Sequence, residues 1–569
     1  MTRLSCGTGL AAGAVVAILT IGPAHGHARA AASPQPPNIV VITTDDQTFE
    51  SMKVMERTNR LLGGQGVTFD NSFVSFSLCC PSRATFLTGQ YAHNHGVQGN
   101  GPPEGGYYKL DSTNTLAIWL QRAGYTTTLV GKYLNRYGTR DPLEIPPGWN
   151  DWHATIDPST YQYYHYTYNE NGHLVFRCPT DAPECYSTDL FARKAREAIR
   201  ARATEAQPFF LWFAVLAPHA GGPTEADDPP YPPTPAPAQR HHNHFAGTEL
   251  PSDPSFNELD VSDKPRPIRR LPRFDAEGVG WLRENYQQEL ESLLSVDEAV
   301  QSIVETLRDT GVLDRTLIVF TSDNGFFHGE HRIPNEKILP YEPSIRVPLI
   351  ISGPGIPHGV HRSQLVANID LAPTIVEAAH LTPDRTMDGH SLYPILRDPG
   401  KEYGRDIVIE NSPGAFHFSG LRTRHFLYVE YDDGERELYD LVKDPYQLQN
   451  VRADPAYASL QSELATRLAA LRDCAGDGCT LPPDAVFTVR PRARGGCRRG
   501  PLTLQVRGAP SLTQVTFMAG GLPIATAERP PFQVLVPRRR LVHGANRLRA
   551  SISATGDQLV TRDLRVRMC

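Results

Sequence analysis

The 569-residue sequence lacks a strict repeat and, after one apolar stretch near its N-terminus, lacks any run apolar enough to span a membrane. The missing repeat excludes collagen-like and coiled-coil proteins. An apolar content of 40% excludes a wholly disordered chain, and the length exceeds what one hydrophobic core usually serves. The 49 prolines and 46 glycines favour an α/β enzyme with long surface loops and at least one smaller attached domain.

The N-terminal segment has the pattern of an export signal. Arg3 precedes an apolar stretch from Leu10 to Ile21, and small residues follow it up to Ala30. The stretch is too short to cross a bilayer. We therefore expect residues 1–30 to be a signal peptide cleaved after Ala30, and the mature protein to be secreted without stable membrane insertion. A retained N-terminal anchor is the alternative.

Cysteine is scarce, with nine residues in the chain and eight after removal of Cys6 with the signal. In an oxidising compartment the spacings suggest three disulfides, although spacing alone does not fix the connectivity: Cys178–Cys185, Cys474–Cys479 and Cys497–Cys569. Cys79 and Cys80 are left over. Neighbouring side chains on an extended strand point in opposite directions, so these two are not expected to bridge each other and need another explanation.

Short apolar runs rich in β-branched residues alternate with helical patterns. The runs predict buried strands of a mostly parallel sheet at 38–43, 126–130, 209–216, 316–321 and 348–352. Helical spacing of apolar positions covers 115–123, 286–310 and 369–380. This order predicts an α/β domain over residues 37–400, with helices on both faces of the sheet.

Two changes in the hydrophobic pattern of the sequence indicate smaller domains. Short alternating segments and a helix at 457–471 predict an antiparallel subdomain over 401–480, and alternating runs predict an immunoglobulin-like β-sandwich over 485–569. The sandwich has fifteen arginines, no lysine and three acidic residues, a balance of +12, so the rest of the chain carries −18 of the overall −6. We expect this basic module to hold an anionic polymer by salt-sensitive attraction; the alternative is a passive arginine-rich domain.

Polar side chains directly follow four of the predicted strands. Asp45 and Asp46 follow the first, Lys132 the second, His219 the third, and Asp323 with Asn324 the fourth. Ligands of open α/β sheets gather at the carboxyl ends of the strands, so we expect these side chains on one rim. Taken singly, Asp-Asp is an ordinary loop or helix cap and Asp-Asn-Gly an ordinary tight turn.

The most specific motif is Cys79-Cys80-Pro81-Ser82-Arg83, followed by Leu-Thr-Gly89. It resembles the Cys-x-Pro-Ser-Arg motif of the sulfatase family, in which a formylglycine-generating enzyme oxidises the cysteine to formylglycine. Proline at plus two and arginine at plus four select Cys79 rather than Cys80. The alternative interpretation is a pair of buried thiols before a loop proline.

Formylglycine suits the cleavage of an anionic ester. Its hydrate carries two hydroxyls: one attacks sulfur, and the other later loses its proton, which expels sulfate and regenerates the aldehyde. A cation would lower the pKa of the hydrate and hold the sulfate oxygens. Asp45, Asp46, Asp323 and Asn324 offer hard oxygen ligands, which suit Ca²⁺ and, less well, Mg²⁺. The resemblance implies that these four residues and Cys79 form the metal site.

The resemblance also implies a catalytic group made of Cys79, Arg83, Lys132, His219 and Lys337. Arg83 lies one helical turn from Cys79 if a helix begins there, close enough to steady the hydrate or a sulfate oxygen. The two lysines can neutralise the transferring group, and His219 could protonate the leaving alkoxide. Without the family, lone lysines would be interpreted as solvated and a lone histidine as packed.

The resemblance covers about residues 37–480 and implies an alkaline-phosphatase-like fold. It is greatest for the N-acetylglucosamine-6-sulfatase branch, through Gly-Lys-Tyr-Leu-Asn135, Pro-Pro-Gly-Trp149 and Tyr-Ser-Thr-Asp189. Many arylsulfatases carry a histidine where this chain has Leu134. The base that collapses the sulfated intermediate is therefore open, and the remaining candidates are His93, His95, His328 and His331.

A cluster of tyrosines and a cluster of histidines each have two interpretations. Five tyrosines between Tyr161 and Tyr168 precede Asn169–Gly172 and predict one arm of a hairpin. They are either an aromatic wall for sugar rings or ordinary cross-strand packing. His241, His242 and His244 lie in a proline-rich loop, as a metal site or as part of a polar loop.

The sequence thus predicts a secreted sulfuric ester hydrolase that acts on sulfate monoesters of carbohydrates, resembling N-acetylglucosamine 6-sulfate, or of aryl alcohols. Two alternatives stay open: a phosphonate or phosphodiester hydrolase of the same superfamily, and a non-catalytic secreted glycan-binding protein. Nucleic-acid binding is not expected, because the basic segment has no recognisable reading motif.

Overall fold

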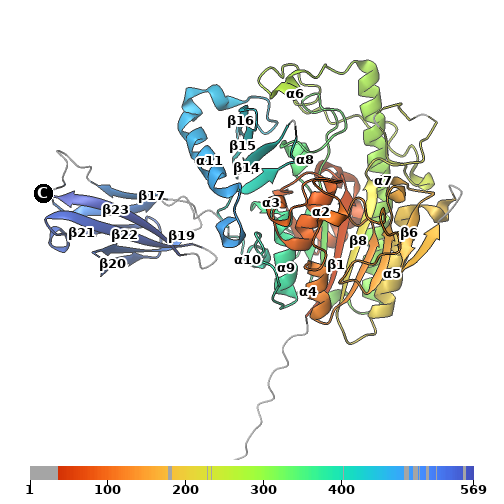
Figure 1. The fold of residues 1–569 in the computed structure, drawn as a ribbon, viewed down its shortest axis with the longest axis horizontal. Coiled ribbons are helices and arrows are strands. Elements are labelled where there is room, and N and C mark those ends of the chain that lie inside the picture. The colour runs from red at the N-terminus through yellow and green to blue at the C-terminus, as the bar shows by residue number, and fades with distance from the viewer. Residues whose placement is uncertain are drawn as a thin grey trace, which may run out of the picture. The chain divides into compact units, whose positions relative to one another are not determined.

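A computed structural model of the chain is shown in Figure 1. It describes residues 36–569 except 177–181, 227, 232, 402, 415, 480–485, 491–497, 499, 508–511, 521 and 555–558. The predicted signal peptide lies outside the described residues. Within the described part of the chain, every helix falls short of the length and apolar character needed to cross a membrane.

A ten-stranded mixed sheet forms the centre of the larger part of the chain. Its strand order is β11 (Val360–Arg362), β2 (Gly66–Phe69), β10 (Leu349–Ser352), β9 (Thr316–Ser322), β1 (Asn38–Asp45), β8 (Phe209–Pro218), β4 (Thr126–Gly131), β5 (Asp151–Thr155), β6 (Thr167–Glu170) and β7 (His173–Phe176). The five strands from β9 to β5 run parallel. All five predicted strands are present, but β10 runs antiparallel to both neighbours.

Helices cover both faces of this sheet, as Figure 1 shows. On one face lie α2 (Cys79–Thr88), α4 (Leu116–Arg122) and α9 (Leu371–Ala378), and on the other α5 (Ser187–Arg202) and α7 (Ala276–Asp309). The sheet has an apolar core on each face, and successive residues of β1 point into these two cores in turn. Ile39 and Val41 are buried in the first core, and Val40 and Ile42 are buried in the second. A parallel strand buried on both sides must be apolar throughout, which explains the continuous runs in the sequence.

The predicted helices are confirmed with shifted ends. Helix α7 begins ten residues before the predicted start, because Asp275 caps it by accepting a hydrogen bond from the backbone N–H of Gly278 at 2.9 Å. The remaining described α-helices and two-residue strands are α1 (Glu56–Thr58), α3 (Ala92–His95), α6 (Arg266–Arg269), α8 (Glu342–Ile345), α10 (Tyr393–Arg397), β3 (Ser72–Phe73) and β12 (Val366–Ala367).

The predicted antiparallel subdomain is a four-stranded sheet with a helix. The strands are β13 (Ile407–Glu410), β14 (Phe418–Arg422), β15 (Phe426–Tyr431) and β16 (Arg436–Asp440), followed by α11 (Ala458–Leu471). Leu464, Leu468 and Leu471 of α11 are buried in the shared core. The disulfide Cys474–Cys479 closes this region as predicted.

The C-terminal segment forms two antiparallel sheets. One contains β17 (Val486–Arg490), β18 (Leu502–Arg507) and β21 (Gln533–Val536); the other contains β20 (Leu522–Ala527), β19 (Leu512–Ala519), β22 (Gly544–Ala554) and β23 (Leu559–Met568). Alternate residues of both sheets, such as Leu504 and Ile552, meet in one apolar core. Cys185 and Cys569 are disulfide-bonded, while Cys178 and Cys497, the partners predicted for them, lie outside the described residues.

Candidate functional site

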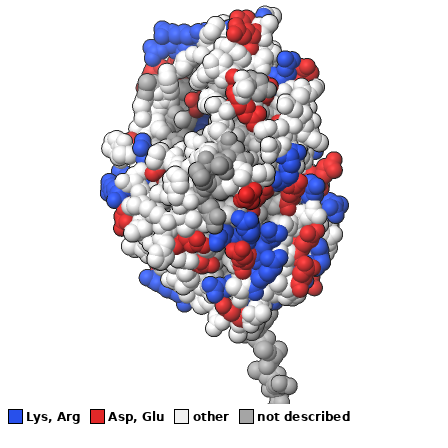
Figure 2. Space-filling view, turned by 90° about the vertical axis from the view of Figure 1, so that its right-hand side faces the viewer, with Lys and Arg blue, Asp and Glu red and all other residues white. Residues whose placement is uncertain are grey.

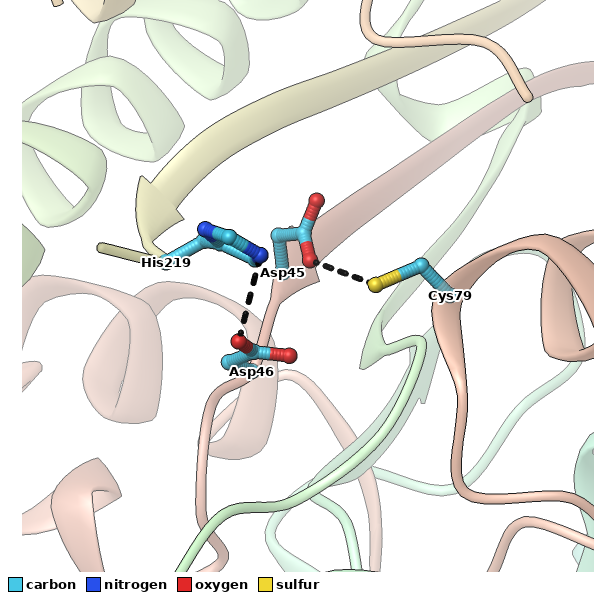
Figure 3. Close-up of side chains that lie close together, drawn as sticks. All are labelled: Asp45, Asp46, Cys79 and His219. Carbon is cyan, nitrogen blue, oxygen red and sulfur yellow. Dashed lines mark hydrogen bonds and ion pairs between the residues drawn. The ribbon is translucent and has the colours of Figure 1, made fainter. Parts of the chain in front are cut away.

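Strand β1 brings two consecutive carboxylates to one point at its carboxyl end. Asp45 ends the strand, and Asp46 follows with a φ of 68°, in the left-handed region that residues other than glycine seldom adopt. Successive side chains on an extended strand point to opposite faces. The left-handed turn instead lets Asp46 face the same centre as Asp45, as Figure 3 shows.

Cys79 is the first residue of helix α2, and its sulfur lies in this centre. The Sγ atom lies 3.4 Å from Asp45 Oδ1 and 3.3 Å from Lys337 Nζ. The positive end of the helix dipole favours a negative group at this place. Cys80 points away from this centre into the apolar core, so the two neighbouring cysteines do not bridge each other, as predicted. Asn100 accepts a hydrogen bond from the backbone N–H of Cys80 at 3.0 Å.

Strand β9 supplies the other predicted oxygen ligands. Asp323 Oδ1 accepts a hydrogen bond from the backbone N–H of Asp46 at 3.3 Å, and Asn324 Nδ2 donates to Asp46 Oδ1 at 2.6 Å. Because β9 and β1 are parallel neighbours, their carboxyl ends meet at one edge. The structure therefore brings the side chains that follow β1 and β9 together at one edge of the sheet.

Three cations face the three carboxylates. Arg83 donates from Nε to Asp323 at 2.7 Å and from Nη2 to Asp45 at 3.1 Å. Lys132 forms an ion pair with Asp45, and Lys337 Nζ donates to Asp46 Oδ2 at 2.7 Å. All six side chains are at least nine-tenths buried. The centre is neutral when all six groups are ionised.

These pairings shift the titration of the acids. Burial raises the pKa of Asp45, but the charges of Lys132 and Arg83 outweigh it and hold that pKa well below its usual value. Burial and the nearby charge of Asp45 raise the pKa of Asp323 to about 6. Arg83 and Lys337 have raised pKa values, because the carboxylates outweigh the effect of burial. Arg83, Lys132 and Lys337 are therefore charged at neutral pH.

Neither cysteine is activated as a thiol. Burial, followed by the charge of Asp45, raises the pKa of Cys79 far above its usual range, and burial raises the pKa of Cys80 to about 12. A thiolate is the nucleophilic form of cysteine. Unmodified Cys79 is consequently a poor nucleophile, and its sulfur marks the place where the oxygens of a modified residue would stand.

His219 follows β8 and completes the cluster. Its Nδ1 donates to the carbonyl oxygen of Ala220 at 2.7 Å, which leaves Nε2 facing Asp46 Oδ2 at 3.6 Å. Burial lowers the pKa of His219, although the charge of Asp46 opposes the shift. The ligand atoms of Asp45, Asp46, Cys79 and His219 all lie within 4.8 Å of one another.

The donor set fits a divalent cation that prefers oxygen. Asn324 Oδ1 is buried and has no hydrogen-bond partner, which is costly unless another positive group approaches it. It lies among carboxylates that already share three cations. A divalent ion would change this neutral centre into one of charge +2, which attracts an anionic ester.

The four unassigned histidines are committed to other contacts. His93 bonds Glu410 at 2.6 Å, His95 bonds Thr85 at 3.0 Å, His328 bonds Glu289 at 2.6 Å, and His331 bonds Glu258 at 2.6 Å. Of the five histidines considered for proton transfer, His219 is the one that joins the carboxylate cluster. This geometry favours His219 over the other candidates for proton transfer.

Tyr161 belongs to the site, although no individual role could be predicted for it from the sequence. Lys132 Nζ lies 4.9 Å from its ring centroid, and the ring of His219 lies 5.1 Å away. Its hydroxyl accepts a hydrogen bond from Asn135 Nδ2 at 2.5 Å. The cluster of tyrosines was the available signal, but spacing alone could not select one member.

The other tyrosines correct the prediction of one aromatic arm. The hairpin exists between β6 and β7, with Asn171 and Gly172 at the turn, but of the five tyrosines only Tyr168 lies on its strands. Tyr163, Tyr166 and Tyr168 are buried in the core beside α5. These three side chains pack and do not form a wall for sugar rings.

The histidine-rich loop likewise makes local contacts. His241 lies 3.3 Å from Glu298, and His242 lies 2.9 Å from Glu225. Among the described residues, the cluster with the geometry to hold a metal ion is the one at Asp45 and Asp46.

The profile of the sulfatase family matches residues 37–381. The chain belongs to the sulfatase family. A second profile, that of the C-terminal part of N-sulphoglucosamine sulphohydrolase, matches residues 329–474. The resemblance carried by Cys79–Arg83 is thereby confirmed, and the protein is an enzyme that hydrolyses sulfate esters.

Relatives of this sulfatase match most of its length. The arylsulfatase of Volvox carteri is 34% identical over 524 residues, which cover 82% of this chain and 79% of that protein. The N-acetylglucosamine-6-sulfatase of Homo sapiens is 34% identical over 515 residues, which cover 82% of this chain and 90% of that protein.

A solved structure supports the alkaline-phosphatase-like fold. It is described as a complex with its substrate D-glucosamine-2-N,6-O-disulfate, has a TM-score of 0.64 and 25% identity, and covers 76% of this sulfatase and 97% of that chain. The fold class predicted from the sequence is confirmed.

Proposed function

We propose that this sulfatase is secreted and removes sulfate from sulfated amino sugars resembling N-acetylglucosamine 6-sulfate, using formylglycine formed at Cys79. The observation that carries the proposal is the position of Cys79 Sγ, at the start of α2 and within 4.8 Å of ligand atoms of Asp45, Asp46 and His219. Relatives that match most of the chain include an enzyme named for that sugar ester. The N-terminal apolar stretch in the sequence supports secretion.

The implied groups would supply the covalent and electrostatic chemistry. A hydrated aldehyde at position 79 would offer one hydroxyl to attack sulfur and a second whose deprotonation releases sulfate. A Ca²⁺ ion held by Asp45, Asp46, Asp323, Asn324 and residue 79 would polarise the sulfate oxygens and lower the pKa of the hydrate.

The chain's own residues position and balance these groups. Arg83 fixes Asp45 and Asp323 relative to each other, because its Nε and Nη2 donate to both carboxylates. Lys337 places positive charge 3.3 Å from Cys79 Sγ, and Lys132 places a second charge on Asp45, which also contacts Cys79. The fixed cations need no reorganisation when substrate charge arrives.

His219 would give a proton to the leaving sugar oxygen from Nε2. Its Nδ1–H bond to Ala220 holds the ring orientation and directs Nε2 to the centre. Asp46, 3.6 Å away, favours the protonated form that this step needs, while burial disfavours it. Burial prevails, so the pKa of His219 lies below its usual value.

A substrate panel tests the proposal. N-acetylglucosamine 6-sulfate, 4-nitrophenyl sulfate and phenyl phosphonate would be supplied to the purified enzyme, with Cys79→Ala as the control. We expect the sugar sulfate to give the highest kcat/KM. A preference for the phosphonate would replace the proposal with the rival hydrolase, and binding of the sugar without turnover would favour a glycan-binding protein.

We also propose that the C-terminal module retains sulfated polymers near the catalytic domain. On β22, Arg547 and Arg549 alternate with the buried Leu548 and Ala550, so they face away from the core. In the ladder between β22 and β23, Arg547 is the register partner of Arg565. The net charge of +12 over residues 485–569 would attract a polyanion.

A further inference from the structure

A cavity of about 380 Å³ lies between the loops that follow β1 and β9 and the sheet of the antiparallel subdomain. The lining residues used below are Phe49, Glu330, Arg346, Arg422, Arg424 and Tyr446. None of these residues has a part in the proposed cleavage step. The cavity is large enough for one sugar ring with its substituents.

The cavity adjoins the carboxylate centre along two chain segments. Thr48 lines it and follows Asp46 by two residues, so the two Cα atoms are at most about 7 Å apart. Pro343 also lines it, and its carbonyl oxygen accepts a hydrogen bond from the backbone N–H of Phe326, two residues after Asn324, at 2.9 Å. A ligand in this cavity is therefore close to the loops that carry the predicted metal ligands.

Two guanidinium groups are held rigidly at one end. Arg346 donates from Nε and Nη2 to the carbonyl oxygen of Asp70 at 3.1 and 2.6 Å and stacks 4.1 Å from the ring centroid of Phe49. Arg422 donates from Nε to Glu342 at 2.6 Å and stacks 4.5 Å from the ring centroid of Phe73. Stacking on aromatic rings fixes the planes of both guanidinium groups.

The charges of Arg346 and Arg422 lie close enough to act on each other. Burial lowers the pKa of Arg346, and the neighbouring charge of Arg422 lowers it further while Glu342 opposes the shift. Arg424, which is exposed, adds a third guanidinium to the same wall. Planar guanidinium groups are the usual partners of carboxylate and sulfate groups.

Other residues of the cavity suit sugar hydroxyls. Glu50, Asp253 and Glu330 also line it, and carboxylates accept hydrogen bonds from hydroxyl groups. Tyr446 is 39% exposed and offers a ring on which the apolar face of a sugar can pack. The cavity thus offers guanidinium groups, carboxylates and an aromatic ring to a ligand.

We propose that this cavity binds an acidic sugar unit of the substrate chain, with its carboxylate or sulfate group on Arg346, Arg422 and Arg424 and its hydroxyls toward Glu330. The proposal rests on the proposed carbohydrate substrate and adds a specificity site to it. It makes the enzyme prefer oligosaccharides that carry a second anionic group to a single sulfated sugar.

The test compares a disaccharide that contains a uronate and N-acetylglucosamine 6-sulfate with 4-nitrophenyl sulfate. In the double variant Arg346→Gln/Arg424→Ala, KM for the disaccharide should rise about tenfold or more, because hydrogen bonds to charged groups are lost. Turnover of 4-nitrophenyl sulfate should be unchanged. Arg346→Lys, which keeps the charge, should recover part of the loss.

The matched control is Arg397→Ala. Arg397 also stacks on an aromatic ring, 4.8 Å from the centroid of Tyr393, but does not line the cavity. An unchanged KM in the double variant, or an equal loss on both substrates, would overturn the proposal. So would a variant that loses only inhibition by inorganic sulfate, since the cavity would then hold the free product ion.

Calorimetry separates this proposal from the catalytic one. The disaccharide would be titrated into the full chain carrying Cys79→Ala, with and without the double substitution. Weaker binding in the second protein supports the cavity site even if the parent enzyme cleaves no sulfate ester. Equal binding rejects the cavity site whatever the outcome for catalysis.

Discussion

At the scale of the residue, Cys79 and Cys80 are a matched pair for testing the modification. Cys79→Ala should lower kcat/KM by about 10³-fold or more, because the nucleophile is removed. Cys80→Ala should keep activity and cost about 1 kcal/mol of packing, because its sulfur lies in the apolar core. Steady-state kinetics on 4-nitrophenyl sulfate and chemical denaturation measure the two effects. Equal activity of the two variants would reject Cys79 as the reacting residue.

His219 is tested by the leaving group. A general acid contributes about 10²- to 10⁴-fold to the departure of a poor leaving group. His219→Ala should therefore lower kcat for N-acetylglucosamine 6-sulfate by that amount and lower it much less for 4-nitrophenyl sulfate, whose phenolate leaves without a proton. The same loss on both substrates would assign His219 to positioning or to the metal instead.

The metal centre is tested by removal and replacement. Dialysis against a chelator should abolish activity, and Ca²⁺ should restore it better than Mg²⁺ or Zn²⁺, because the donors are carboxylate and amide oxygens. Asn324→Ala should weaken the restoration, since its buried Oδ1 has no other partner. Full activity of the chelated protein would contradict a metal role.

Most residues of the candidate site could be predicted from the sequence, because they follow the ends of strands or belong to one motif. Asp45, Asp46, Lys132, His219, Asp323 and Asn324 each follow a strand whose apolar run is evident in the sequence. Tyr161 could not be chosen, because its contact with Lys132 depends on how a turn before β6 folds back on the rim. The cavity beside Arg346 and Arg422 could not be foreseen either, since it joins segments far apart in the chain.

At the scale of the element, His93 ties α3 to the antiparallel subdomain. Its ring nitrogens contact Glu410 at 2.6 Å and the carbonyl oxygen of Cys474 at 2.9 Å. Burial opposes protonation, but Glu410 outweighs it and raises the pKa of His93 to about 9. The stabilisation is complete below the unfolded pKa of about 6.5 and is lost as the pH rises through about 9.

Thermal unfolding of His93→Gln should therefore show a larger loss of Tm at pH 6 than at pH 9.5. His95→Gln is the control, because burial lowers the pKa of His95 to about 3 and the residue stays neutral over this range. A Tm difference for His93→Gln that does not depend on pH would contradict the ion pair.

Strands could be predicted from the sequence where burial on both faces of the sheet determines their pattern. Buried parallel strands give continuous apolar runs, so β1, β4, β8 and β9 could be placed to within two residues. The antiparallel direction of β10 could not be predicted, because an apolar run has no direction and the chain returns through the loop that carries Lys337. The prediction that the tyrosine segment forms a strand was wrong, because most of its side chains are buried in the apolar core beside α5.

At the scale of the whole molecule, the chain has two segments of opposite net charge. Residues 485–569 carry +12 and the rest −18, while the face in Figure 2 shows acidic and basic side chains interspersed. Truncation before Leu481 should leave hydrolysis of 4-nitrophenyl sulfate intact and lower the salt concentration at which the protein elutes from heparin resin. Unchanged retention would remove the proposed role of the module.

Substitutions distinguish a specific face from net charge. Arg547→Ala/Arg549→Ala/Arg567→Ala should weaken retention more than Arg529→Ala/Arg539→Ala/Arg540→Ala, although each removes three charges. The first set lies on the strands β22 and β23, and the second lies outside the two strands. Equal losses would mean that the module acts by net charge alone.

Peptide mass spectrometry of residues 77–83 from the active, natively produced enzyme tests the role of Cys79 most directly. We expect an aldehyde at position 79 and an intact thiol at position 80. An unmodified thiol at position 79 in protein that still turns over sulfate esters would contradict the proposed mechanism.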